Sequence, residues 1–213
     1  MTVVVEGLGL RYPRAAAPVF SGLSAAFAPG ALTAVTGPSG SGKSTLLYVL
    51  GLLVRPTAGD VLWDGVPTQG LTDLERSRIR ARDIGFVFQD ALLDPARSIL
   101  ENVCDAGLFA GMDRAVQVEL AQVLLGRFGV EHRASHKPGE ISGGQAQRVA
   151  LCRALLTSPR VVLGDEPTGN LDAESARVVW DALRDHARTG ATVVVATHDE
   201  RLADTADHRL VLP

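Results

Sequence analysis

The 213-residue sequence has little of several features that would each point to a particular class of protein. It has two cysteines, Cys104 and Cys152, which lie far apart and form no CxxC pair, so we expect reduced thiols in a cytosolic protein. Basic residues are not in excess, because the formal net charge is −3. The sequence therefore has no polybasic signature for nucleic acid or anionic lipid, and it predicts no nucleic-acid partner.

Long hydrophobic runs are also missing. No apolar run approaches the roughly 20 residues of a membrane-spanning helix, and residues 1–6 lack the charged and apolar regions of a signal peptide. We therefore expect a cytoplasmic protein without direct membrane insertion, which would be peripheral on the inner face of the cell membrane through a partner. With 46% hydrophobic and 21% charged residues, the composition is that of an ordinary globular domain.

A glycine-rich loop lies between an apolar run, residues 31–36, and a helical stretch, Ser44–Leu50. Glycines let the backbone turn tightly and aim its N–H groups at an anion, and the N-terminus of the following helix adds partial positive charge. Lys43 is placed to reach terminal phosphates, and the Ser44 hydroxyl to ligate Mg²⁺. We predict nucleotide binding by this loop, which consists of Gly37, Pro38, Ser39, Gly40, Ser41, Gly42, Lys43, Ser44 and Thr45.

Two further patterns indicate sites for charged groups. Asp165 and Glu166 follow an apolar strand, where an Asp can hold Mg²⁺ through its hydration shell and a Glu can polarise a water. Ser142 precedes two glycines at the start of a helix, which is an anion site of the helix-cap type. On their own, the first pattern could be a solvated acidic turn and the second an ordinary helix cap.

Strand and helix patterns alternate along the rest of the chain, which favours an α/β fold with an antiparallel part at the N-terminus. No internal repeat or linker divides the chain. The expected strands are residues 3–6, 19–27, 60–63, 84–88, 160–164, 192–196 and 209–212. The expected helices are residues 71–82, 98–110, 114–128, 145–156, 173–187 and 200–205.

These motifs, in their order and spacing, closely resemble those of the ATP-binding-cassette (ABC) ATPases, the nucleotide-binding subunits of ABC transporters. The resemblance covers essentially the whole chain, and the signature motif distinguishes this family from other P-loop NTPases. The matching segments are the Walker A loop (Gly37–Thr45), the Q-loop (Phe88–Gln89), the signature (Ile141–Gln145), Walker B with its glutamate (Val161–Glu166), the D-loop (Asn170–Asp172) and the H-loop (Thr197–Asp199).

The resemblance implies ATP and Mg²⁺ as cofactors and a role for each matching residue. The implied catalytic residues are Glu166 as general base, His198, Gln89 and Lys43. The residues implied to lie at the Mg²⁺ site are Ser44, Gln89 and Asp165. Beyond the Walker A loop, the implied ATP-binding residues are Tyr12, which would stack on adenine, and Ser142, Gly143, Gly144, Gln145 and Asp172. Ser142 and Gly144 would bind the γ-phosphate of ATP held by a second copy, so the resemblance implies a head-to-tail dimer.

The implied fold is a P-loop NTPase of ABC ATPase type, with a mixed sheet core, an N-terminal antiparallel β subdomain and a helical subdomain. We expect a single domain over residues 1–213. Its core would span about 1–88 and 159–213, and its helical, signature-bearing part about 89–158. The sequence departs from the family in having Ile141 for leucine and Gly164 in the Walker B strand. It ends at Pro213, where the family usually continues with a hairpin, so we expect no regulatory extension.

Residues 165–172 and the stretch from Leu92 to Val103 resemble most closely the lipoprotein-release, macrolide-export and cell-division branch. The resemblance implies transport-coupled ATP hydrolysis that does export or extraction work on a transmembrane permease-type subunit. We expect residues 90–97 to dock on that subunit through exposed Leu92 and Leu93, although both leucines could instead fold back onto the chain's own helices.

The sequence argues against two other functions. A soluble ABC ATPase acting on nucleic acid or ribosomes is disfavoured, because there is one cassette and no coiled coil between Lys43 and Ser142. A P-loop kinase or GTPase outside the ABC family is excluded mainly by the signature motif.

Overall fold

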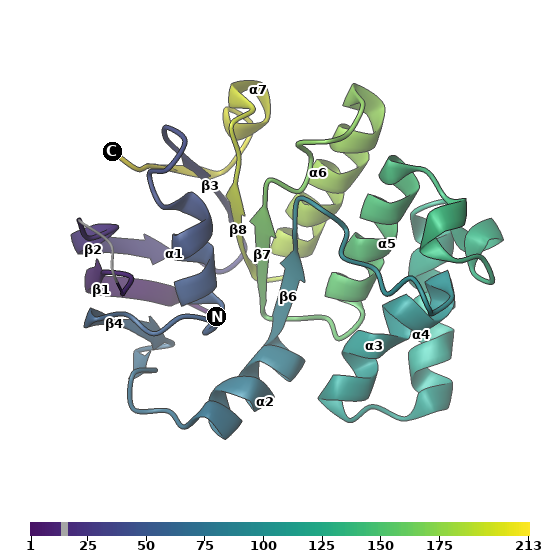
Figure 1. Cartoon of the computed structure of the whole chain (residues 1–213), viewed down its shortest axis with the longest axis horizontal. Coiled ribbons are helices and arrows are strands. Elements are labelled where there is room, and N and C mark those ends of the chain that lie inside the picture. Colours follow the sequence, from purple (N-terminus) through teal and green to yellow (C-terminus); the bar gives the residue numbers. More distant parts are fainter. Residues whose placement is uncertain (14–16) are drawn as a thin grey trace.

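A computed structural model describes residues 1–13 and 17–213, and the strands within those ranges form two sheets (Figure 1). The first sheet is antiparallel, with the order β2-β1-β4-β5. Its strands are β1 (Val3–Leu10), β2 (Phe20–Phe27), β4 (Ala58–Trp63) and β5 (Val66–Pro67). The β4–β5 hairpin turns through Asp64 (φ 50°) and Gly65 (φ 80°), the positive-φ pair that an Asp-Gly hairpin requires.

Strand β1 is longer than the sequence predicted. The periodicity indicated residues 3–6, whereas the strand continues to Leu10. The pairing of β1 with β4 is interrupted between Glu6 and Gly9, where Gly7 has φ 57°. This bulge inserts extra backbone and breaks the alternation of side chains, which is why the pattern appeared to stop at Glu6.

The second sheet is parallel, with the order β6-β7-β8-β3-β9. Its strands are β3 (Leu32–Thr36), β6 (Ile84–Val87), β7 (Val161–Asp165), β8 (Thr192–Ala196) and β9 (His208–Val211). Every residue of β3, β7 and β8 is buried, as expected for strands covered on both faces. The α/β prediction is confirmed, and the antiparallel and parallel parts of the expected mixed core form separate sheets.

The helices agree with the predicted positions to within a few residues. They are α1 (Lys43–Leu50), α2 (Asp73–Asp83), α3 (Ile99–Ala110), α4 (Arg114–Arg127), α5 (Gly143–Leu155), α6 (Ala173–Arg188) and α7 (Glu200–Ala203). Two short 3₁₀ turns, Glu131–Arg133 and Pro138–Glu140, precede α5. Within the described ranges, none of the helices combines the length and apolar character needed to cross a membrane.

Helix α5 begins two residues before the predicted start. The Ser142 side chain accepts a hydrogen bond from the Gln145 backbone N–H, and the Gln145 side chain accepts one from the Ser142 N–H. This reciprocal cap starts the helix at Gly143, so both signature glycines lie in its first turn.

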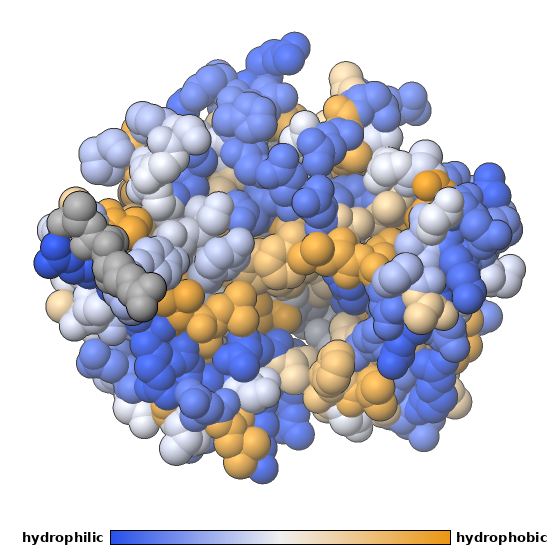
Figure 2. Space-filling model, in the orientation of Figure 1, coloured by the Kyte–Doolittle hydropathy of each residue, from blue (hydrophilic) through white to orange (hydrophobic). Residues whose placement is uncertain are grey.

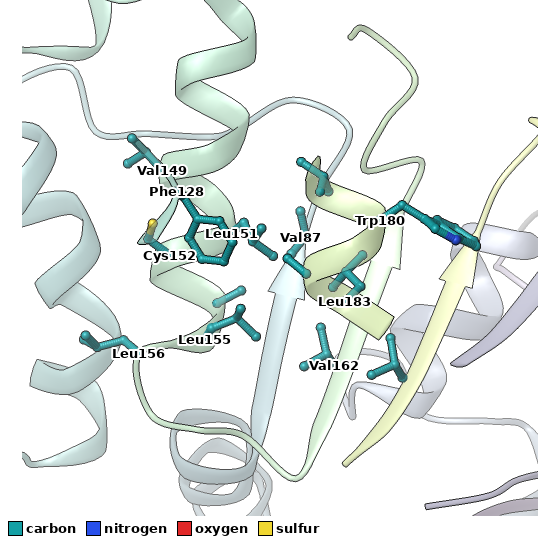
Figure 3. Packing of buried hydrophobic residues seen from close by; sticks show 14 of the residues in the cluster. Val87, Phe128, Val149, Leu151, Cys152, Leu155, Leu156, Val162, Trp180 and Leu183 are labelled. Carbon is teal, nitrogen blue, oxygen red and sulfur yellow. The ribbon is translucent and has the colours of Figure 1, made fainter. Parts of the chain in front are cut away.

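In the part of the chain that the structure describes, two hydrophobic clusters form the core. One joins the parallel sheet to α3, α4, α5 and α6, and includes Phe128, Cys152, Leu155, Val162 and Trp180 (Figure 3). The other packs α1 between the antiparallel strands and the other face of the parallel sheet. The buried side chains of α1 are Leu46, Leu47, Val49 and Leu50. Each contributes about 1.5–3 kcal/mol on burial, so α1 and the loop before it are held rigidly.

Candidate active site

The loop between β3 and α1 has a backbone that only glycine adopts without strain. Gly37, Gly40 and Gly42 have φ values of 146°, 82° and 95°. A Cβ on Gly42 would lie 2.6 Å from Val19, and one on Gly37 would lie 2.6 Å from the Leu212 carbonyl oxygen. The loop is therefore closed tightly against its neighbours, with the N-terminus of α1 behind it.

Lys43 folds back over this loop. Its Nζ donates hydrogen bonds to the carbonyl oxygens of Gly37 (2.9 Å) and Pro38 (3.0 Å). A cavity of about 310 Å³ opens beside it, lined by Val19, Ser39, Gly40, Gly42, Lys43, Ser44, Thr45 and Glu166. An ammonium group and a helix N-terminus at one cavity suit a phosphate-bearing ligand.

Asp165 ends β7 and is held by two hydroxyl groups of α1. The Ser44 hydroxyl donates to Asp165 Oδ1 at 2.8 Å, and the Tyr48 hydroxyl donates to Oδ2 at 3.3 Å. Burial, followed by the negative charge of Asp165, raises the pKa of the Tyr48 phenol. Tyr48 was not among the predicted site residues. It lies four positions after Ser44, on the same helix face, and this spacing is the signal that could have found it.

Glu166 and His198 meet across the neighbouring strands β7 and β8. Glu166 Oε2 accepts hydrogen bonds from the His198 backbone N–H at 3.2 Å and contacts His198 Nδ1 at 2.8 Å. Glu166 also has φ 49°, an unusual conformation for a residue that is not glycine. Such backbone strain is typical of functional sites, and here it turns the carboxylate toward the phosphate-loop cavity.

Tyr12 and Gln89 lie at two edges of this site. The Tyr12 hydroxyl is 3.4 Å from Thr45 Oγ1, and its side chain is partly exposed, as a stacking platform requires. Gln89 follows β6 and is exposed. A Cβ on Gly169 would lie 3.5 Å from Gln89 Nε2, so this side chain lies against the turn that follows Glu166. Within the described ranges, Gln89 makes no hydrogen bond to the Ser44–Asp165 pair.

The signature residues are not part of this cavity in one chain. Ser142 and Gly143 are exposed, and Gly144 packs near Ser175, with Asp172 beside them. Asp172 caps α6, and the backbone N–H of Ser175 is the main cause that lowers the pKa of its carboxyl. In Figure 1, β8, β7 and α6 separate the start of α5 from the loop before α1. One chain therefore does not bring the two halves of the predicted site together.

A groove of about 390 Å³ lies where α2, β6, α3 and α5 meet. Figure 2 shows hydrophobic side chains around a hollow at the centre of the same face. Leu92 and Phe109 line the groove and are 61% and 75% exposed. Arg153 donates to the carbonyl oxygens of Ala91 and Leu92, both at 2.8 Å, and so fixes this part of the segment after Gln89.

The expectation of exposed leucines in this segment is confirmed for Leu92 and wrong for Leu93. Leu93 is only partly exposed and packs against the core cluster that contains α3 and α5. Leu92 has φ 47°, and this backbone turn directs the two leucines differently.

Comparisons with known proteins agree with this geometry. A family model described as "ABC transporter" matches residues 20–169. Two similar proteins are both described as the lipoprotein-releasing system ATP-binding protein LolD. The protein of Nitrobacter winogradskyi is 48% identical over 184 residues, covering 86% of this chain and 79% of that protein. The protein of Maricaulis maris is 47% identical over 194 residues, covering 91% and 85%.

A solved structure of an ATP-binding cassette is also similar. It is a dimer in a post-hydrolysis state bound to ADP and Pi, with a TM-score of 0.91 and 35% identity. The alignment covers 99% of this chain and 94% of that one.

Proposed function

Because this chain belongs to the ABC transporter family, we propose that it is the ATP-hydrolysing subunit of a lipoprotein-releasing type of system. Two copies would act together on a membrane partner. The observation that carries the proposal is the meeting of the phosphate loop, Asp165 and the Glu166–His198 pair at the carboxyl edge of the parallel sheet. Ligands of open α/β sheets bind at this edge.

The phosphate loop would hold ATP through backbone N–H groups, the N-terminus of α1 and Lys43. The Lys43 ammonium now bonds two neutral carbonyl oxygens. Charged phosphate oxygens are stronger acceptors, so ATP would draw Nζ onto its β- and γ-phosphates. Tyr12, next to Thr45 at the cavity edge, would stack on the adenine ring.

The residues beside the loop fit Mg²⁺. The Ser44 hydroxyl and the Asp165 carboxylate lie 2.8 Å apart at the nucleotide cavity, and hard oxygen donors of this kind are those that Mg²⁺ prefers. When bound, Mg²⁺ would supply neutralisation of the charge on the phosphates. We also assign Gln89, which lies against the turn after Glu166, to the side of the site where Mg²⁺ would bind.

Glu166 would act as general base. Its carboxylate borders the cavity, where it could take a proton from a water molecule aligned for attack on the γ-phosphorus. The two contacts with His198 hold Glu166 in place, and His198 would itself approach the γ-phosphate. Phosphoryl transfer depends mainly on such positioning and charge stabilisation.

A second copy would complete each site. The exposed start of α5 presents Ser142 and Gly143 to solvent, with the positive end of the helix dipole behind them. Placed over the phosphate loop of another chain, Ser142 and Gly144 would contact the γ-phosphate, with Gln145 and Asp172 supporting them. A head-to-tail pair would then enclose two ATP molecules.

We also propose that the domain consists of two parts that move relative to each other. Residues of about 89–158 would move relative to a core of about 1–88 and 159–213 when nucleotide binds. Gln147, on α5, donates to the Phe88 carbonyl oxygen at 2.7 Å, so the signature helix and the Q-loop are tied together. The groove beside them, with exposed Leu92 and Phe109, would receive a helix of the membrane partner and hold this chain at the inner face of the membrane.

Co-purification with the membrane partner tests this proposal. We expect Leu92→Asp and Phe109→Asp to reduce recovery of the complex strongly, because each replaces an exposed apolar side chain of the groove with a carboxylate that a partner helix would have to bury. Val123→Asp is a matched control, since Val123 is 63% exposed on α4 and does not line the groove. Thermal unfolding of each variant checks its folding. Recovery of the complex with both groove variants, or its loss with Val123→Asp, would contradict docking at this groove.

A further inference from the structure

Tyr48 contacts the Asp165 carboxylate on one side and, on the other, the aromatic wall of the groove, which consists of Phe86 and Phe88. We propose that Tyr48 is a positioning residue, which orients Asp165 for the metal and makes this orientation depend on Phe86. The inference rests on the proposed role of Asp165 and adds a residue to it. Three contacts carry it: Tyr48 to Asp165, Tyr48 to Phe86 and Phe86 to Phe88.

The first contact sets the plane of the carboxylate. Ser44 and Tyr48 lie one turn apart on the same face of α1, and each bonds a different oxygen of Asp165. Asp165 is only 9% exposed, so few water molecules can replace a lost protein donor. If the Ser44 hydroxyl bound the metal, Tyr48 would still donate to Asp165 and hold its carboxylate. Partners of this kind orient a metal-side carboxylate, and their loss typically lowers metal affinity or activity about 10–100-fold.

The other contacts lead from Tyr48 to the groove. The centroids of the Tyr48 and Phe86 rings are 5.9 Å apart with a tilt of 39°, and Phe86 stacks on Phe88 at 4.2 Å. Phe86 and Phe88 both line the groove that contains Leu92. A helix that presses on this wall would shift Phe86, and Tyr48 would carry the shift to Asp165. The side chain of Gln89, the residue after Phe88, lies instead against the turn at Gly169.

Tyr48→Phe is the first test, because it removes the hydroxyl and keeps the ring. Mn²⁺ replaces Mg²⁺ as the probe, and its binding with ATP is followed by electron paramagnetic resonance in a Glu166→Gln background, where turnover is suppressed. We expect Mn²⁺ affinity to fall about 10–100-fold, while ATP affinity in EDTA and the unfolding temperature stay close to those of the parent.

The outcomes separate this inference from the proposed function. Unchanged Mn²⁺ affinity in Tyr48→Phe would overturn the positioning role. A loss of ATP affinity in EDTA as large as the loss of Mn²⁺ affinity would also overturn it, because it would indicate a structural defect of the whole site. The proposed function survives both results, because the parent still binds ATP and Mn²⁺. It fails instead if the parent itself binds no ATP.

Phe86→Leu tests the link to the groove, with Phe128→Leu as a core control that removes a ring elsewhere. We expect Phe86→Leu to weaken Mn²⁺ binding and Phe128→Leu to leave it unchanged. In the double variant Tyr48→Phe/Phe86→Leu, the loss should not exceed that of Tyr48→Phe alone, because Phe86 acts through the missing hydroxyl. Additive losses, or no effect of Phe86→Leu, would overturn the link.

Discussion

At the scale of single residues, Glu166 carries the sharpest chemical prediction. Glu166→Gln keeps the shape of the side chain and its contact with His198, but removes the basic carboxylate. We expect ATP turnover to fall about 10²–10⁴-fold, with ATP binding retained. Phosphate release and binding of a fluorescent ATP analogue measure the two effects. Glu119→Gln, on the exposed side of α4, is the matched control. Normal turnover in Glu166→Gln would remove it from the role of general base.

Lys43 offers a second test at this scale, because the chain has only two lysines, Lys43 and Lys137. Lys43 lines the nucleotide cavity, whereas Lys137 is exposed in the loop before α5. We expect ATP to protect Lys43 from acetylation, since bound phosphates would occupy its ammonium group. Mass spectrometry measures the extent of acetylation of the two lysine-containing peptides. Acetylation of exposed Lys137 in the same sample is the control that the reagent was active. Equal acetylation of Lys43 with and without ATP would show that the phosphates bind elsewhere.

At the scale of helices, the two cysteines report how tightly α3 and α5 pack. Burial raises the pKa of the Cys152 thiol to about 12, and it also raises the pKa of Cys104. A higher pKa lowers the thiolate fraction, so at pH 8 only about one Cys152 in ten thousand is ionised, against roughly a quarter for an ordinary thiol of pKa 8.5.

We therefore expect neither cysteine to react with iodoacetamide at pH 8 while the protein is folded. Both should react in denaturant, where the ordinary thiol pKa returns and the side chains are accessible. Reactivity of the folded protein should rise only as pH approaches the raised pKa values. Mass spectrometry of the two peptides checks this, and rapid alkylation of Cys152 in the folded protein would show that α5 is more loosely packed than the structure indicates.

At the scale of the whole molecule, the separation of Ser142 from the phosphate loop predicts dimerisation driven by ATP. Glu166→Gln, which should bind ATP without turnover, is expected to form a dimer in ATP and to remain a monomer without it. Light scattering measures the mass. A second change, Ser142→Arg, should prevent the dimer, because a bulky cation would occupy the place of the γ-phosphate.

The control for this experiment is Thr72→Arg. Thr72 is exposed and caps α2 with the same reciprocal bonds that Ser142 makes at α5, so both variants lose an equivalent cap of about 1 kcal/mol. Thr72→Arg should leave the ATP-dependent dimer intact. A strictly monomeric Glu166→Gln variant in ATP would count against shared sites, and loss of the dimer in both arginine variants would point to a folding defect.

The sequence by itself determined the fold class and the parts of the site that are local. Strands covered on both faces appear as apolar runs, so β3, β7 and β8 were found at nearly their true bounds. The phosphate loop was recognisable because its glycines are required by its own backbone conformation. The roles given to Glu166, His198, Gln89 and the signature residues stay predictions, of which the variants of Glu166 and Ser142 test two directly.

Only the tertiary structure decided which distant residues meet. The bond from Tyr48 to Asp165 joins α1 to β7, and Leu93 packs inward while Leu92 stays exposed. The separation of Ser142 from the phosphate loop, on which the proposed sharing of sites between two chains rests, follows from the parallel sheet that lies between them. A sequence pattern reports which face of its own element a side chain occupies. Which partner lies opposite that face depends on how the elements pack, and packing is a property of the whole chain.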